Sequence, residues 1–284
     1  MIYKKMKFQC SINCECNEKN FFKLYSYNKK PKNEKNFFIT GKYNRMFYEC
    51  ATCEHLYAKH NFKINKLYSK QYLDLTYKNE KGLDKRFKYI TGLPVSLSDN
   101  KGRAKRVDEF FKKTKKLQLL DVGSGLGVFL HEMRKKNWKV NGIEIDTRYS
   151  DYCKKKHNLN VYKKNLLKFK TKKKFDLISF NKILEHVDYP QRLLKSAKKI
   201  LKKNGIIYIE VPDVYAKVGG KFRGEFCFEH FHIFSLSSLG ILIRRSGLYP
   251  IKLMRIQEPS GKYTIFSFTK KLDKVNFNKK SYMI

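Results

Sequence analysis

The sequence lacks any long apolar run, and this absence excludes the simplest membrane architectures. No stretch approaches the roughly 20 consecutive apolar residues that a membrane-spanning helix requires. The opening segment MIYKKMKFQC is charged and has no apolar core of the kind that a secretory signal peptide carries. Hydrophobic residues make up 42% of the chain and aromatic residues 15%, which is typical of a folded protein. We therefore expect a soluble, cytoplasmic protein without a membrane span.

Acidic residues are scarce, with 25 Asp and Glu against 63 Lys and Arg and a formal net charge of +38. So large a positive charge favours nucleic acid, an anionic membrane surface or phosphorylated molecules as partners. Most of the basic residues are lysines, however, and they are spread through every segment beside abundant Asn, Ile, Phe and Tyr. A compositional drift toward AT-rich codons explains the same pattern. A nucleic-acid partner is therefore compatible with the charge but is not favoured by it.

Cysteine is concentrated near the N-terminus, where five of the seven cysteines fall within the first 60 residues. Cys50 and Cys53 form a CxxC pair, the spacing of a knuckle that presents two thiolates to one tetrahedral Zn²⁺. A second, less regular knuckle contains Cys10 together with either Cys14 or Cys16. We predict a zinc ribbon with a structural ion, because four thiolates leave no open coordination position. Ordinary reduced thiols in a small sheet are the alternative.

The central feature of the chain is a glycine loop between a strand and a helix. The apolar run Leu117–Val122 predicts a buried parallel strand, and Gly123, Gly125 and Gly127 follow it in the pattern GxGxG. Glycine lets the backbone approach a ligand, and the start of the next helix offers unpaired N–H groups. Glu144 lies 21 positions after Gly123, close to the ~20-residue offset at which a carboxylate binds the ribose of a nucleoside. The pattern predicts a site for a nucleoside-bearing cofactor.

Two classes of cofactor share this layout, and one residue favours one of them. A dinucleotide loop of the form GxGxxG needs a small residue at position 128, where this chain has Val128, so NAD is disfavoured. The stretches DVGSGLG and GIEID instead resemble the class I S-adenosylmethionine-dependent methyltransferases. In that case the glycine loop would contact the methionine part of the cofactor, and Glu144 the ribose. The alternative is a glycine turn that serves only helix–sheet packing.

The resemblance implies a full set of cofactor contacts. Asn165 stands where the family often has an acid that meets adenine, and an amide can still make that contact. The strand Phe175–Asn181, FDLISFN, is the one whose residues face the methyl donor in this family. The implied cofactor-binding residues are Asp121, Gly123, Ser124, Gly125, Gly127, Glu144, Asp146, Asn165, Leu166 and Asn181.

Two histidine-containing segments supply the candidate catalytic residues. The stretch LEHV, which includes His186, resembles a segment frequent in the small-molecule branch of the class, although His186 could equally cap the next helix. The stretch EHFHIFS resembles the EHxxxFS segment of sugar methyltransferases, which supplies a histidine to the substrate. We predict His230 as the general base, with Glu229 orienting it and His186 as the second candidate. Zinc binding by His230 and His232 is disfavoured, because alternate residues of an extended segment point opposite ways.

The same resemblance organises the whole chain. The N-terminal cysteines are similar to the zinc-binding module that precedes the sugar C-methyltransferases of deoxysugar biosynthesis, whose further C-terminal domain has no room here. We predict an α/β fold: a Rossmann-like seven-stranded sheet with one antiparallel strand, helices on both faces, and a small zinc ribbon. A helix is predicted from Gln191 to Lys203, ended by Gly205. The expected divisions are a zinc module at 1–60, a helical linker or lid at 61–115, the methyltransferase domain at 116–270 and a basic tail at 271–284.

The expected reaction is an in-line transfer of a methyl group to a small polar acceptor. A nucleotide-linked sugar or another precursor of envelope glycans would give Lys221 and Arg223 a charge to neutralise. Methylation of tRNA or rRNA is the alternative, but the chain lacks a [D/N]PP[Y/F] stretch and a Pro-Cys nucleophile. A zinc-ribbon protein that binds nucleic acid without catalysis is a further alternative, against which the intact glycine loop and Glu144 argue.

Overall fold

The computed structural model describes residues 21–32, 34, 42–60, 80–111 and 116–272, which form two sheets. The larger sheet has seven strands in the order β10-β11-β8-β7-β4-β5-β6. The pairs from β8 to β6 are parallel, whereas β11 is antiparallel to both β8 and β10. The predicted mixed seven-stranded methyltransferase sheet is therefore confirmed. Its strands are β4 (Gln118–Val122), β5 (Lys139–Glu144), β6 (Val161–Lys163), β7 (Phe175–Asn181), β8 (Leu201–Pro212), β10 (Leu248–Gln257) and β11 (Tyr263–Lys271).

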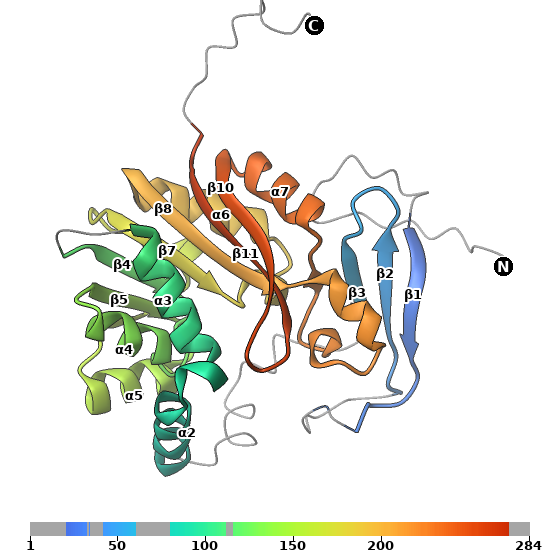
Figure 1. Cartoon of the computed structure of the whole chain (residues 1–284), viewed down its shortest axis with the longest axis horizontal. Helices are drawn as coiled ribbons and strands as arrows, with labels where there is room; N and C mark the ends of the chain where they lie inside the picture. Colours follow the sequence, from blue (N-terminus) through green and yellow to red (C-terminus); the bar gives the residue numbers. More distant parts are fainter. Residues whose placement is uncertain (1–20, 33, 35–41, 61–79, 112–115, 273–284) are drawn as a thin grey trace, which may run out of the picture.

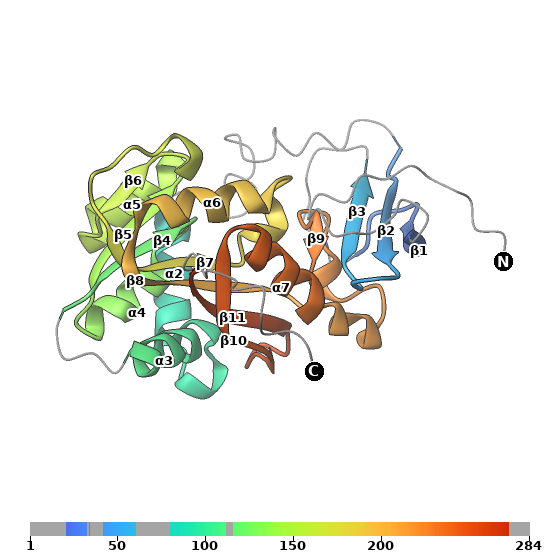
Figure 2. The ribbon, with the colours of Figure 1, turned by 90° about the horizontal axis from the view of Figure 1, so that it is seen from above.

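Helices cover both faces of this sheet (Figures 1 and 2). Neighbouring strand residues such as Leu119 and Leu120 enter different hydrophobic clusters, since successive side chains of a strand point to opposite faces. The first four helices pack in one cluster and the last two in the other. The helices are α2 (Glu80–Gly92), α3 (Asp99–Phe111), α4 (Val128–Lys135), α5 (Thr147–His157), α6 (Pro190–Ile200) and α7 (Leu236–Arg245).

The smaller sheet joins the N-terminal region to the rest of the molecule. Strands β1 (Phe21–Tyr27), β2 (Arg45–Cys50) and β3 (Leu56–His60) form an antiparallel meander. Its fourth strand, β9 (His232–Ile233), comes from far along the chain and pairs with β3. Figure 1 shows the meander at the end of the molecule that is remote from α4 and α5. Since β9 completes this sheet, the N-terminal region and the loop before β9 form one structural unit.

The structure differs from the sequence prediction around α6. The helix was expected to reach Lys203, but it ends at Ile200 and the chain enters β8 at Leu201. Gly205 lies inside that strand and does not cap the helix. A Cβ at Gly205 would lie 2.9 Å from the carbonyl oxygen of Phe175, so glycine lets β8 approach β7 closely.

In the part of the chain that the structure describes, no helix combines the length and apolar character needed to cross a membrane.

Candidate functional site

The glycine loop forms a cradle at the carboxyl end of β4. The backbone N–H groups of Gly123 and Ser124 both donate to the carbonyl of Ile143, at 2.8 and 3.1 Å, which holds the loop against β5. Gly125 has a φ of +50°, and a Cβ there would meet nothing within 4 Å. At Gly127, by contrast, a Cβ would lie 2.9 Å from Sγ of Cys153. Gly125 therefore faces open space in which a ligand can approach the backbone.

Glu144 closes the cradle from the end of β5. Its Oε2 accepts from the N–H of Gly125 at 2.8 Å, and its Oε1 accepts from the N–H of Asp146 at 3.0 Å. Burial raises the pKa of Glu144, and these two backbone hydrogen bonds offset part of that rise. The carboxylate is thus held in one orientation beside the glycine loop, where a ribose hydroxyl can donate to its remaining lone pairs.

Asp121 lies at the floor of the cleft. Its Oδ1 accepts from Ser179 Oγ at 2.7 Å and from Asn181 Nδ2 at 2.8 Å. Burial raises the pKa of Asp121 to about 7, despite these hydrogen bonds. Nearby, Ser124 Oγ and Asn181 Oδ1 are buried and have no hydrogen-bond partner in the structure. Since buried polar atoms are normally paired, these atoms indicate a missing polar ligand.

A cleft of about 230 Å³ at the carboxyl ends of β4 and β7 is lined by Asp121, Ser124, Gly125 and Asn181, among others. The orphaned oxygens, the Asp121 carboxylate and the open space at Gly125 fit S-adenosylmethionine, whose ammonium group would donate to oxygens at the floor of the cleft. Arg103 also lines this cleft and forms a 2.7 Å hydrogen bond from Nε to Glu210 Oε2. The sequence analysis missed Arg103, because only the fold brings α3 to β8.

Three further predicted cofactor residues, Asp146, Asn165 and Leu166, do not belong to the lining of this cleft. Asp146 caps α5, accepting from the N–H of Arg148 at 2.9 Å. Asn165 caps a short 3-10 turn, η4 (Leu166–Lys168), through a 2.8 Å hydrogen bond from the N–H of Leu167. Leu166 is buried in the core, whereas Leu167 is 51% exposed and Ile145, next to Glu144, is 64% exposed. Leu166, which the sequence suggested as a contact to adenine, therefore packs inward, whereas Leu167 and Ile145 expose apolar side chains to solvent.

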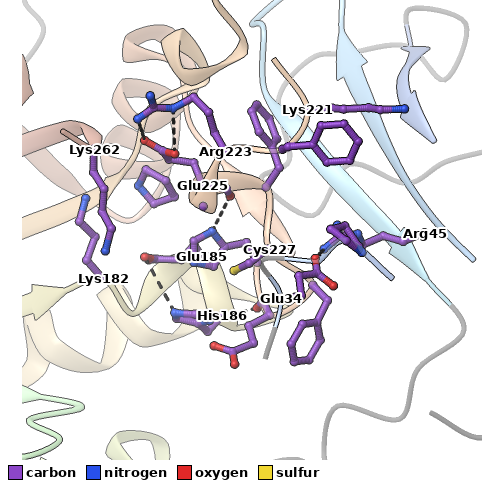
Figure 3. A pocket seen from close by; sticks show the side chains of 18 of the residues that line it. Glu34, Arg45, Lys182, Glu185, His186, Lys221, Arg223, Glu225, Cys227 and Lys262 are labelled. Carbon is purple, nitrogen blue, oxygen red and sulfur yellow. Dashed lines mark hydrogen bonds and ion pairs between the residues drawn. The ribbon is translucent and has the colours of Figure 1, made fainter. Parts of the chain in front are cut away.

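A second cavity, the acceptor pocket, lies beyond the end of β7 and has a volume of about 350 Å³ (Figure 3). The two cavities are lined by neighbouring residues of the chain: Asn181 lines the cofactor cleft, and the next residue, Lys182, lines the pocket. Its lining combines charged side chains with four aromatic ones, Phe222, Phe226, Phe228 and Tyr263, and no Leu, Ile or Val belongs to it among the described residues. Its charged residues are Glu34, Arg45, Lys182, Glu185, Lys221, Arg223, Glu225, Glu229 and Lys262.

The pocket brings together the two predicted catalytic histidines. The ring centroids of His186 and His230 are 4.8 Å apart. His186 Nδ1 lies 3.0 Å from the carbonyl oxygen of Glu229, and His230 Nδ1 lies 2.7 Å from that of Glu225. Burial lowers the pKa of both imidazoles. The contact that orients His230 thus comes from the Glu225 backbone and not from the Glu229 carboxylate.

Glu185 is the acidic residue of this cluster, and the sequence analysis did not select it. It lies in the short turn η5 (Leu184–His186), has no exposed surface, and its Oε1 is 4.0 Å from His186 Nε2. Glu185 is the glutamate of the LEHV stretch, so the sequence did contain it. His230 lies in a distant loop, however, so only the fold shows that Glu185, His186 and His230 come together.

Of the other residues that the sequence analysis discussed, Lys221 and Arg223 line the acceptor pocket, whereas His232 does not. Arg223 pairs with Glu225 at 2.8 Å and is thereby partly neutralised, whereas Lys221 lines the acceptor pocket. His232 is fully buried and contacts His55, so it points away from the side on which His230 lies. The opposite orientation of His230 and His232 agrees with the expectation from an extended segment.

The zinc-ribbon prediction is only partly covered by the described residues. Cys50 ends β2 and Cys53 lies in the turn that leads to β3, and both are buried. The N–H of Glu54 donates to the carbonyl of Cys50 at 2.8 Å, which closes this turn. Cys10, Cys14 and Cys16 lie outside the described residues, so the four-thiolate site stays a prediction.

Comparison with known families agrees with this geometry. Residues 99–253, more than half of the chain, match the family described as a methyltransferase domain. The chain therefore belongs to this family, and the class I S-adenosylmethionine-dependent assignment made from the glycine loop is confirmed.

Curated relatives match over part of their length. The ubiquinone biosynthesis O-methyltransferase of Pelagibacter ubique (strain HTCC1062) is 34% identical over 122 residues, which are 39% of this chain and 51% of that protein. The protein of the same name from Coxiella burnetii (strain Dugway 5J108-111) is 25% identical over 155 residues, or 50% of this chain and 62% of that protein. The chain thus spans about half to three fifths of these relatives.

Solved structures share the fold at low sequence identity. The 1,6-didemethyltoxoflavin-N1-methyltransferase of Burkholderia thailandensis, with bound S-adenosylhomocysteine, aligns with a TM-score of 0.56 and 13% identity over 84% of this chain and all of that one. The magnesium protoporphyrin IX methyltransferase of Synechocystis PCC 6803 gives a TM-score of 0.52 at 14% identity, over 69% and 97% of the two chains.

Proposed function

We propose that this protein transfers the methyl group of S-adenosylmethionine to a hydroxyl group of a small polar acceptor. The observation that carries the proposal is the junction at the end of β7. Asn181 lines the cofactor cleft there, while Glu185 and His186, a few residues further, line the acceptor pocket. A cofactor bound in the cleft would present its methyl group toward a molecule in the pocket, the arrangement that an in-line displacement requires.

The lining of the pocket supports a polar acceptor. Three lysines, Lys182, Lys221 and Lys262, line a cavity that also contains several aromatic side chains but no Leu, Ile or Val among the described residues, which suits an anionic molecule with a ring better than a lipid tail. The name of the relatives, ubiquinone biosynthesis O-methyltransferase, favours oxygen as the methylated atom. A nucleotide-linked sugar, whose phosphates the lysines would neutralise, is our first candidate.

The cluster of Glu185, His186 and His230 marks the part of the pocket where the acceptor would lose its proton. Removal of the proton by a positioned group accelerates such a transfer by about 10²–10⁴-fold. We also retain the proposal that Cys50 and Cys53, with Cys10 and either Cys14 or Cys16, hold a structural zinc ion that stabilises the N-terminal sheet.

An acceptor screen tests the proposed function. The purified protein is incubated with S-adenosylmethionine and either nucleotide-sugars, hydroxylated aromatic acids or transfer RNA, and the release of S-adenosylhomocysteine is measured. We expect turnover with the nucleotide-sugars, unchanged in Glu109→Gln, a variant at an exposed position of α3 that lines neither cavity. Turnover with transfer RNA alone would refute the small-molecule proposal.

A further inference from the structure

Glu185, His186 and His230 form a converging set of ligand atoms in the acceptor pocket. One carboxylate oxygen and one nitrogen from each imidazole all lie within 4.8 Å of one another. Glu185 and His186 come from η5, while His230 comes from the loop before β9. Among the described residues this is the one group of three or more His, Cys, Asp or Glu side chains with such spacing.

The hydrogen bonds of the two histidines fix their tautomers. A carbonyl oxygen can only accept. Nδ1 of His186 therefore donates to the backbone carbonyl of Glu229, and Nδ1 of His230 donates to the backbone carbonyl of Glu225. In a neutral imidazole, this leaves Nε2 unprotonated with a free lone pair. A metal-ligating histidine is typically oriented by the same kind of bond, from its second nitrogen to a backbone carbonyl.

The third group, Glu185, carries an independent sign of a missing ligand. Its side chain has no exposed surface, and neither Oε1 nor Oε2 has a hydrogen-bond partner in the structure. A buried carboxylate without partners is costly, and such groups are normally paired or bind a metal. The nearby Lys182 ammonium attracts this carboxylate electrostatically, but its hydrogen bond goes to Thr264 Oγ1 on β11, and Figure 3 shows Lys182 and His186 on different sides of Glu185.

We propose that Glu185, His186 and His230 bind one divalent transition-metal ion in the acceptor pocket. Imidazole and carboxylate ligands suit Zn²⁺, Mn²⁺, Fe²⁺, Co²⁺ and Ni²⁺, and three protein ligands leave at least one coordination position open. In a tetrahedral site with bonds of about 2.0–2.1 Å, ligand atoms lie roughly 3.4 Å apart. The 4.0 Å between Glu185 Oε1 and His186 Nε2 therefore needs only small side-chain rotations to close.

The role of the ion in catalysis rests on the proposed function. An acceptor hydroxyl in the open position would lose its proton to solvent more readily, because the cation stabilises the resulting oxyanion. The oxyanion would then attack the methyl carbon of S-adenosylmethionine, forming the O–CH₃ bond while the S–CH₃ bond breaks and neutral S-adenosylhomocysteine leaves. In this arrangement the two imidazoles act as ligands, and the metal replaces a histidine base.

Metal binding can be measured without any acceptor. The chelator-treated full chain is titrated with Mn²⁺, and the free ion is followed by electron paramagnetic resonance. Mn²⁺ prefers oxygen and nitrogen ligands, so it reports on this cluster and not on the N-terminal cysteines. We compare the wild-type protein with Glu185→Gln, which keeps the size of the side chain, with His230→Gln, and with the surface control Glu109→Gln.

We expect one Mn²⁺ per chain in the wild-type protein and in Glu109→Gln, and at least tenfold weaker binding in Glu185→Gln and in His230→Gln. Retained binding of S-adenosylhomocysteine shows that a variant is folded. Equal Mn²⁺ affinity in all four proteins, or no binding by the wild-type protein, would overturn the metal site. The proposed function fails separately, if the wild-type protein binds Mn²⁺ but not S-adenosylhomocysteine.

Discussion

His55 Nε2 lies 3.0 Å from His232 Nδ1, and both imidazoles are fully buried. His232 Nε2 is 3.0 Å from the carbonyl oxygen of Val187 and must donate to it, so its Nδ1 is an acceptor. His55 therefore donates through Nε2 and can accept from Ser238 Oγ, 3.3 Å from its Nδ1. This chain of neutral groups joins the N-terminal sheet to the segment that follows the acceptor-pocket histidines.

The pairing of His55 with His232 predicts a pH-dependent contribution to stability. Burial holds the pKa of His55 well below its ordinary value, so only the unfolded chain takes up this proton as the pH falls below about 6.5. Stability contributed by neutral His55 is present above pH 6.5 and is lost below it. In His55→Phe the unfolding free energy should fall by about 2 kcal/mol at pH 7.5, because His232 Nδ1 loses its donor.

The difference in unfolding free energy between the wild-type protein and His55→Phe should then shrink by about 2 kcal/mol as the pH falls from 7.5 to 5. Urea unfolding of both proteins across this range measures it. The difference between the two proteins is the useful quantity, because Asp121 and Glu258, whose pKa values are raised to about 7, change stability in the opposite sense. A constant gap would show that His55 is not held neutral in the fold.

Glu144→Gln should weaken cofactor binding by about 10–100-fold, since hydrogen bonds to a charged group contribute about 1.5–3 kcal/mol. The single oxygen of Gln can still accept from the N–H of Gly125, which keeps the shape of the glycine loop, while the bond from the N–H of Asp146 is lost. Calorimetric titration with S-adenosylhomocysteine checks this, with Glu109→Gln as the control. Undiminished affinity in Glu144→Gln would remove Glu144 from the cofactor site.

Alanine substitutions at two glycines of the loop should have different effects, one mainly on cofactor binding and the other mainly on stability. In Gly125→Ala the new methyl group enters open space, so we expect only about 1–2 kcal/mol of backbone strain but a clear loss of S-adenosylhomocysteine affinity. In Gly127→Ala the methyl group meets Cys153 and Leu159 as well, so the unfolding free energy should fall further. Thermal unfolding and calorimetry distinguish the two outcomes, and equal destabilisation would contradict the prediction.

Asp121→Asn should increase stability while reducing cofactor affinity. Burial raises the pKa of Asp121 to about 7, so above that pH the folded protein carries a buried charge that costs a few kcal/mol relative to the unfolded chain. The amide removes this cost, so the variant should be more stable at pH 8, with a smaller advantage at pH 5. S-Adenosylhomocysteine should bind about tenfold more weakly or worse, because the ammonium loses an ionic partner. A variant that is less stable at pH 8 would refute the account.

The parts of the fold that sequence predicted best are those governed by local patterns. The strand Phe175–Asn181 has the predicted bounds, because a short apolar run between polar residues has one simple interpretation. The end of α6 was placed too late, because Leu201 continues the apolar helical spacing although it already belongs to β8. Pairing of β3 with β9 depends on residues about 175 positions apart, for which a single sequence carries no signal.

The candidate site shows the same division. Glu144 and the glycine loop were predicted because their spacing is fixed by one strand–helix–strand unit. Glu185 and Arg103 were missed because their significance comes from partners on other elements. The burial of Leu166 beside the exposed Leu167 could not be predicted, because sequence position alone does not tell which of two adjacent side chains turns toward the core.

The stretch that matches the methyltransferase family, residues 99–253, contains the described lining of the cofactor cleft apart from Ile90 on α2, but it does not contain the whole lining of the acceptor pocket. Glu34 and Arg45 reach the pocket from the N-terminal side, and Lys262 and Tyr263 reach it from the C-terminal side. Under the proposed function, the choice of acceptor is therefore encoded partly in segments that can diverge while the donor site stays the same. We then expect exchange of such segments between homologous chains to redirect the methyl group to a new molecule without rebuilding the site that supplies it.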